Sequence, residues 1–66
     1  MATLTSREQL VLGNIEEIAE TIGNIKYFVF SELVDFDLDN SKEELKVIVE
    51  KLQRDGYLND YKVWMV

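Results

Sequence analysis

Basic side chains gather in the C-terminal part of this sequence and are its first candidates for ligand binding. Five of the seven basic residues lie in residues 41–66, which have the pattern of a helix followed by an extended segment: Lys42, Lys46, Lys51, Arg54 and Lys62. Cationic side chains neutralise the phosphates of a nucleic acid, which supplies much of the affinity in such complexes. Their grouping therefore makes this part of the chain a candidate nucleic-acid-binding face.

The charge balance of the whole chain opposes that interpretation. The sequence has 13 acidic and 7 basic residues, with a net charge of −6. Residues 1–40 contain eight acidic and two basic residues, whereas residues 41–66 contain five of each. This asymmetry fits a weak nucleic-acid-binding face on an acidic body, and it equally fits an ordinary solvated helix with mixed charges.

Three alternating aspartates, Asp35, Asp37 and Asp39, have the spacing of the first ligands in a calcium-binding EF-hand loop. That loop also needs Gly at its sixth position and Glu at its twelfth, where this sequence has Asn40 and Lys46. Short Asp and Asn side chains bond to their own backbone and interrupt helices. We therefore interpret this segment as an acidic turn between helices, and we expect no metal and no cofactor.

The residue types that most enzymes use are missing from this chain. Cys and His are absent, which removes nucleophilic thiols, disulfides, thiolate or imidazole metal ligands and the usual general base near neutral pH. A catalytic pair of carboxylates would need a concave pocket to separate their pKa values, which a domain of this size rarely contains. We expect a protein that is not an enzyme.

Sixty-six residues without Pro or low-complexity runs predict a single domain spanning residues 1–66. A core this small supplies only about 3–5 kcal/mol, so we expect support from self-association as a homodimer. No stretch approaches the roughly 20 apolar residues of a membrane span. The first residues also lack the basic and apolar regions of a signal peptide. These features predict a soluble, cytoplasmic protein that does not enter a membrane.

A first helix should begin at a capping box formed by Thr5 with Glu8 or by Ser6 with Gln9. The dipeptide Gly23-Asn24 should end it, because both residues tolerate the left-handed conformation of a helix stop. Apolar residues at helical spacing form its buried stripe: Leu12, Ile15, Ala19 and Ile22, with Val11 and Ile18 beside them.

Residues 25–30 are aromatic or β-branched and almost continuously apolar, which favours an extended segment buried on more than one side. A short second helix should follow, either capped by Ser31 or beginning earlier, near Tyr27. A third helix should begin at the capping box of Ser41 with Glu44. Its apolar stripe consists of Leu45, Ile48, Val49 and Leu52.

Gly56 should end the third helix in the left-handed conformation, so that Tyr57 and Leu58 fold back over the helix. The remaining segment, residues 57–66, has the pattern of a tight β-hairpin. Alternation along it would place Tyr61 on the core face and Trp64 on the outer face.

This order of elements resembles the winged helix-turn-helix domains of small bacterial, archaeal and phage regulators, such as the MarR-like group. The resemblance rests on residues 31–34 followed by a turn, on residues 45–52, and on the segment 53–58 around Gly56. It implies an α+β fold of three helices followed by a C-terminal β-hairpin wing. It also implies a small transcriptional regulator that binds double-stranded DNA, with recognition helix 41–55 in the major groove and wing 57–66 on the backbone.

The resemblance assigns DNA contacts to Ser41, Lys42, Glu43, Lys46 and Lys62. A departure from the family is Asp60, which stands in the wing turn where basic residues are common. The alternative function is an acidic winged-helix module for protein–protein interaction, which would act as an inhibitor or accessory factor of a nucleic-acid-processing protein. Such a module would meet a basic protein surface.

Four apolar residues are candidates for contact with a partner or a second copy: Leu4, Leu10, Val11 and Trp64. Exposed Trp is enriched at the centres of protein interfaces, and an edge strand at the C-terminus can pair with another chain. The alternative for Trp64 is ordinary packing over the edge of the first helix.

Overall fold

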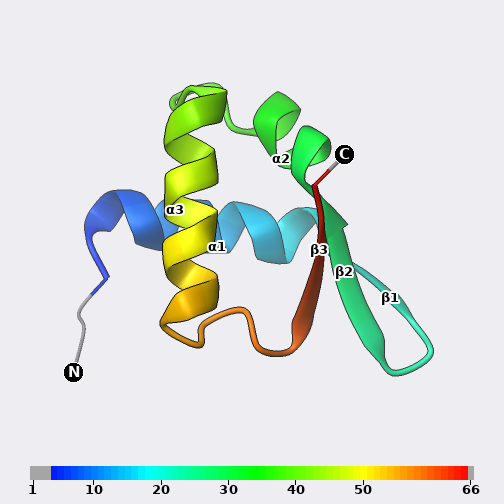
Figure 1. Cartoon of the computed structure of the whole chain (residues 1–66). Coiled ribbons are helices and arrows are strands. Elements are labelled where there is room, and N and C mark those ends of the chain that lie inside the picture. The colour runs from blue at the N-terminus through cyan, green and yellow to red at the C-terminus, as the bar shows by residue number, and fades with distance from the viewer. Residues whose placement is uncertain (1–3, 66) are drawn as a thin grey trace.

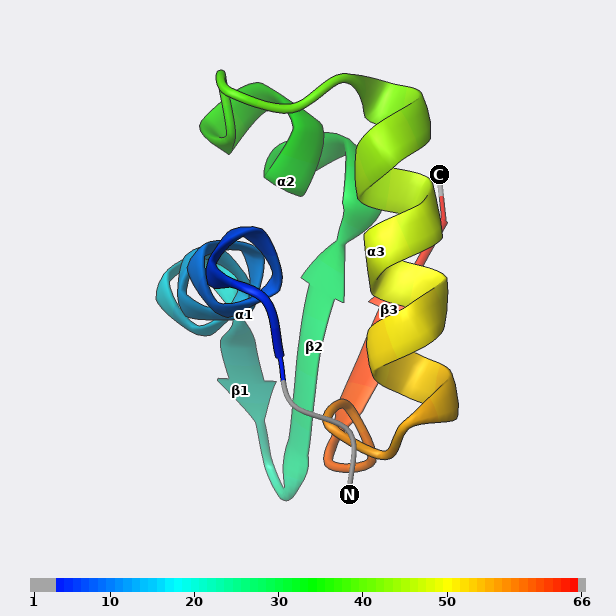
Figure 2. The same ribbon diagram turned by 90° about the vertical axis from the view of Figure 1, so that its left-hand side faces the viewer.

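The computed structural model describes residues 4–65, which form a small α+β domain with three helices and one three-stranded sheet. Its elements follow in the order α1 (Ser6–Ile18), β1 (Glu20–Ile22), β2 (Ile25–Val29), α2 (Phe30–Phe36), α3 (Lys42–Arg54) and β3 (Tyr61–Trp64). The helices gather on one side of the sheet (Figure 1). Figure 2 shows α1 end-on, while α3 runs alongside β2 and β3. The predicted α+β class and the three helices are confirmed.

The sheet has the strand order β1-β2-β3. Strands β1 and β2 are antiparallel, and a two-residue turn at Gly23 and Asn24 joins them. Strands β2 and β3 are parallel, so the chain crosses from one to the other through α2 and α3. In that pair Phe28 is in register with Val63, which places both side chains on the helical face of the sheet.

The predicted β-hairpin over residues 57–66 is wrong, because the C-terminal segment supplies the single strand β3, which pairs with β2. Residues 57–60 form turns, and Leu58 is buried in the core. A hairpin would require these turn residues to form its first strand. The final residue of the predicted hairpin, 66, lies outside the described residues.

The predicted reversal after Gly56 is confirmed, and the backbone conformation and hydrogen bonds around Gly56 explain why the chain turns there. Gly56 has a φ of +89°, and its N–H donates to the carbonyl of Gln53 at 3.2 Å. The next N–H, from Tyr57, donates to the carbonyl of Leu52 at 2.9 Å. These two bonds are the Schellman closure of a helix C-terminus, and they direct Leu58 back toward the core.

The first helix ends earlier than its apolar stripe predicted. It stops at Ile18, and Gly23-Asn24 forms the turn between β1 and β2. Gly at the first position of a two-residue turn supplies the positive φ that such hairpins require, and Gly23 has a φ of +62°. Ile22 is therefore a strand residue with 66% of its surface exposed.

The predicted N-caps of the two long helices are confirmed. Thr5 and Glu8 form a complete capping box at α1. At α3 the Ser41 hydroxyl accepts from the Glu44 N–H at 3.2 Å, but the Glu44 carboxylate accepts from the Ser41 hydroxyl, so only this half of the predicted capping box forms. Helix α2 begins at Phe30, between the two predicted starts. The predicted cap at Ser31 is wrong, because the N-cap is Val29, two residues earlier, and it makes no side-chain cap bond.

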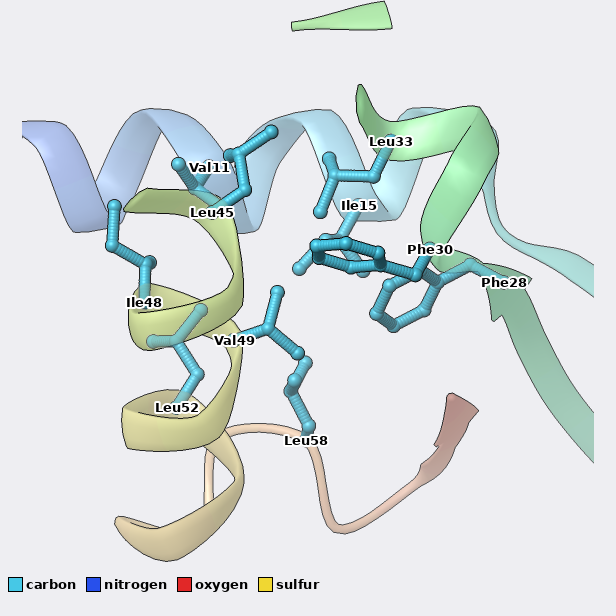
Figure 3. Packing of buried hydrophobic residues seen from close by; sticks show 10 residues of the cluster. All are labelled: Val11, Ile15, Phe28, Phe30, Leu33, Leu45, Ile48, Val49, Leu52 and Leu58. Atoms are coloured by element: carbon cyan, nitrogen blue, oxygen red, sulfur yellow. The ribbon is translucent and has the colours of Figure 1, made fainter. Parts of the chain in front are cut away.

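A single hydrophobic core lies between the helices and the sheet (Figure 3). The stripe predicted for α3 is buried in full, and Phe28 and Phe30 enter the same core from the end of β2 and the start of α2. The expected burial of residues 25–30 on more than one side is wrong, because the alternate residues of β2 face away from the core and Ile25 is 48% exposed. The core consists of Val11, Ile15, Phe28, Phe30, Leu33, Leu45, Ile48, Val49, Leu52 and Leu58.

Glu8 is a buried carboxylate that connects α1 to α3. It accepts a hydrogen bond from the Thr5 N–H at 2.9 Å and forms an ion pair with the Lys51 Nζ at 2.9 Å. The Thr5 N–H, followed by the Lys51 ammonium, lowers the pKa of Glu8. The capping box therefore also fixes the position of α1 against α3.

Asp37 is buried and organises the turn between α2 and α3. Its carboxylate accepts bonds from the backbone N–H groups of Asp39 and Asn40 and from the side-chain amides of Asn14 and Asn40. This arrangement confirms the interpretation of the acidic segment as a turn, because both carboxylate oxygens are held by neutral donors.

We expect Gly56→Ala to lower the free energy of unfolding by about 1–2 kcal/mol, because an L-residue is strained in the left-handed conformation. The new Cβ would also lie 3.3 Å from the Asn59 Nδ2. The matched control is Gly13→Ala inside α1, where a Cβ meets nothing within 4 Å, and we expect it to stabilise by about 1 kcal/mol. Urea unfolding followed by circular dichroism measures both changes, and equal effects would contradict the predicted role of Gly56.

Candidate interaction surfaces

The outward side of α3 carries more negative than positive charge. Opposite the buried stripe, helical spacing places Glu43, Val47, Glu50 and Arg54, all of which are exposed. Val47 has 65% of its surface exposed at the middle of this side. If α3 docked into the major groove, this side would present the carboxylates of Glu43 and Glu50, the guanidinium of Arg54 and, at its middle, the apolar side chain of Val47.

Lys42 and Lys46 lie to one side of this outward stripe. They line a shallow hollow between α2 and α3 together with Asp35, Glu50 and Met65. The two ammonium groups therefore share their surroundings with two carboxylates, which reduces the positive potential available to a phosphate.

Two further predicted DNA contacts lie at the N-terminus of α3. The Ser41 hydroxyl accepts from the Glu44 N–H and donates to the Glu44 Oε1 at 3.3 Å, so it is engaged by the helix cap. Glu43 lines a different hollow, on the α1 side of α3, with Arg7 and Val47. Arg7 itself forms an ion pair with Glu44 at 2.7 Å.

Lys62 lies on the side of the sheet that faces away from the helices. It is exposed on β3, and it lines a hollow with Tyr27 and Trp64. Helix α3 packs against the opposite side of the sheet. The five predicted DNA-contact residues therefore do not form one continuous surface.

The side of the sheet that faces away from the helices, here called the outer sheet face, carries several exposed apolar residues. Residues that alternate with the core-facing ones point away from the helices on all three strands. Exposed fractions reach 66% for Ile22, 48% for Ile25 and 53% for Trp64. No helix or strand of residues 4–65 covers this side (Figure 1). The outer sheet face consists of Glu20, Ile22, Ile25, Tyr27, Val29, Lys62 and Trp64.

An aromatic pair stands at the centre of the outer sheet face. The rings of Tyr27 and Trp64 stack with centroids 5.2 Å apart and planes inclined by 29°. The Tyr27 hydroxyl donates to the Glu20 Oε2 at 2.6 Å. This bond, together with desolvation and the negative charges of Glu20 and Glu32, raises the pKa of Tyr27. The Tyr27 ring is thus held by the hydrogen bond to Glu20 and by stacking on Trp64.

The predicted outward position of Trp64 is confirmed, and the alternative of packing over α1 is wrong because Trp64 stacks on Tyr27. The other predicted contact residues lie elsewhere. Val11 is fully buried, so its assignment to a contact surface is a mistake: its side of α1 faces the core. Leu4 is half-buried against the core, and Leu10 is 67% exposed on α1, away from the sheet.

Sequence reasoning missed five members of the outer sheet face: Glu20, Ile22, Ile25, Tyr27 and Val29. It assigned the first two to a helix and the other three to a segment buried on several sides. The signal that could have found them is Gly23-Asn24 between β-branched neighbours, which is a pattern typical of a two-residue hairpin.

The side-chain clusters of residues 4–65 include no group of acidic residues arranged to hold a metal ion. None of the helices in this described part of the chain is long and apolar enough to cross a membrane. Comparison of the chain with protein-family models, curated proteins and solved structures finds no match.

We expect the Tyr27 phenol to lose its proton above its usual pKa of 10.0, because the phenolate would face the Glu20 carboxylate. The hydrogen bond should be intact at neutral pH and lost as the pH rises through the raised pKa. Trp64 is the only Trp, so its emission reports this step through quenching by the stacked phenolate. Glu20→Gln should lower the quenching midpoint, and Tyr27→Phe should remove that component. An unchanged midpoint in Glu20→Gln would contradict the assignment.

Proposed function

We propose that this chain is a non-enzymatic protein-interaction module that binds a protein partner through the outer sheet face. The observation that carries the proposal is the grouping of Ile22, Ile25, Tyr27 and Trp64 on one uncovered side of the sheet. Exposed apolar residues scattered singly are normal, whereas a contiguous patch with polar residues at its edge marks an interaction site.

The chemistry of this patch supports protein recognition. Tyr and Trp are enriched at the energetic centres of protein interfaces, because a large ring contributes contact area with few rotatable bonds. Here the Tyr27 ring is held by the Glu20 carboxylate and by Trp64. A partner therefore meets side chains that are already ordered, which lowers the entropy cost of binding.

An accessory role also suits the fold. The order of α1, β2, α2, α3 and β3 is compatible with a winged-helix-like arrangement, in which the hairpin wing is replaced by a parallel strand. Winged helices are used both for nucleic-acid binding and for docking to proteins. The net charge of −6 favours the second use in this chain.

Site-specific photo-crosslinking in cells that produce the chain tests this proposal. We expect a benzophenone amino acid at position 22 to capture a protein, and we expect Trp64→Ser in the same chain to abolish the product. The matched control carries the probe at Leu38, which is 90% exposed in the turn before α3. Capture from both positions alike, or from position 38 alone, would mean that the sheet face is not the binding surface.

Double-stranded DNA binding is the second candidate function, and one observation favours it. Helix α3 is the second helix of the pair formed by α2, the turn and α3, and its Lys42 and Lys46 are exposed four residues apart. The carboxylates of Glu43, Glu50 and Asp35 beside them oppose it.

A salt titration with fluorescent double-stranded DNA decides between the two candidates. We expect no binding that depends on Lys42 and Lys46, because too few cations face one side to neutralise several phosphates. If α3 did bind DNA, affinity would fall steeply with salt. Lys42→Ala combined with Lys46→Ala would then reduce the slope of log K against log salt by about 2. The control combines Arg7→Ala with Lys26→Ala, which removes the same charge outside the predicted DNA contacts.

A further inference from the structure

We propose that the partner of the outer sheet face is a second copy of this chain, stacked face to face about a two-fold axis that runs parallel to the strands. This inference rests on the proposed use of that face and names its occupant. The observations that support it are the register of the charged residues and the position of the aromatic pair, and the size of the patch limits the strength of the contact.

One row across the outer sheet face carries opposite charges at its two ends. The strand register aligns Glu20 of β1 with Tyr27 of β2, and Tyr27 with Lys62 of β3. The row therefore runs from a carboxylate through a phenol to an ammonium. Within residues 4–65 the ion pairs involve Glu8 and Glu44, so Lys62 has no carboxylate partner in its own described chain.

A two-fold axis parallel to the strands and centred over β2 makes this row complementary to itself. The rotation lays β1 of one copy over β3 of the other without moving either along the strand direction. Glu20 of each copy then faces Lys62 of the second copy, so that two equivalent ion pairs form. Tyr27 lies on the axis and faces the same residue of the second copy.

The apolar residues flank this charged row on both sides. Ile22 and Ile25 form the neighbouring row toward the hairpin turn, and Val29 and Trp64 form the row toward α2. Packed sheets lie about 10 Å apart with interdigitated side chains. Both apolar rows would lose water in the dimer, and the charge pairs between them would set the register.

The Glu20 carboxylate can serve both contacts. Its Oε2 accepts from the Tyr27 hydroxyl, and a carboxylate accepts several hydrogen bonds at once. The remaining acidic excess lies mainly on the helical layer, which faces away from the stacked sheets. Charges separated by more than about 8–10 Å are largely screened at physiological salt, so the net charge permits this contact.

The size of the face sets the strength of the expected dimer. Three strands about 4.8 Å apart and a five-residue β2 give a face of roughly 14 by 17 Å. This is smaller than the ~800 Å² per partner of a standard interface. We therefore expect a weak, reversible dimer with a dissociation constant on the order of 100 µM.

Sedimentation velocity of the purified chain, from about 1 µM to about 1 mM, tests the inference. We expect a monomer–dimer equilibrium in which Glu20→Lys or Lys62→Glu alone raises the dissociation constant at least about tenfold. The double variant should return to within about threefold of the original, because it restores both pairs with their signs exchanged. A merely structural effect of losing the Glu20 bond to Tyr27 would not be rescued in this way.

Matched controls change the same net charge away from the outer sheet face. Glu16→Lys on α1 and Lys46→Glu on α3 replace exposed residues, and both should leave the equilibrium unchanged. All four charged side chains are exposed, and circular dichroism checks that each variant is folded.

A chain that stays monomeric at about 1 mM, or a double variant no better than the single ones, overturns the inference. The proposed function fails separately. If the probe at position 22 captures a different protein while the chain is monomeric, the sheet face is a docking site for another partner. If it captures nothing in cells and the chain is monomeric, both proposals fall.

Discussion

Parallel pairing of β3 with β2 requires the chain to cross one face of the sheet between the two strands, and most of the structure follows from that requirement. The crossing is made by α2 and α3, which bury Leu33, Leu45 and Leu52 against the sheet. Helix α1 joins the same side, where the Glu8–Lys51 ion pair fixes it to α3. All helical cover is thereby placed on one face, and the other face keeps its alternate strand residues in contact with solvent.

Local signals in the sequence were sufficient for the starts of the two long helices and for the end of α3, whereas the sheet depended on pairing between segments distant in the sequence. The caps at Thr5 and Ser41 and the stop at Gly56 act within a few residues of themselves, so the sequence alone could predict them. Ile22 fits a helical stripe and a strand equally well, and only its pairing with Ile25 decides. The partner of β3 was still harder to predict, because β2 is more than 30 residues away in the sequence.

The residues of the candidate site also divide into those that local sequence signals could predict and those that depend on contacts between distant segments. The outward direction of Trp64 followed from alternation along its own strand. The roles of Tyr27 and Glu20 did not, because they arise when three strands align in register across the sheet. For α3 the sequence identified exposed lysines, but it could not show that Lys42 and Lys46 share a hollow with Asp35 of another helix. The number of charged residues along the sequence does not show how their charges combine on the folded surface, which determines the local potential.

The charged and the apolar surface residues lie mainly on different layers of the fold, which explains how an acidic chain can carry an apolar sheet face. The helical layer holds most of the charged side chains, and its outward α3 stripe is apolar only at Val47. The sheet layer holds the aromatic pair together with the single charged row. An apolar patch on a charged body has few competing ways to associate, because most other contacts between copies would bring like charges together. In the proposed dimer the charged row would select one register among the few that remain, so its specificity would come from electrostatics and its affinity from the rings.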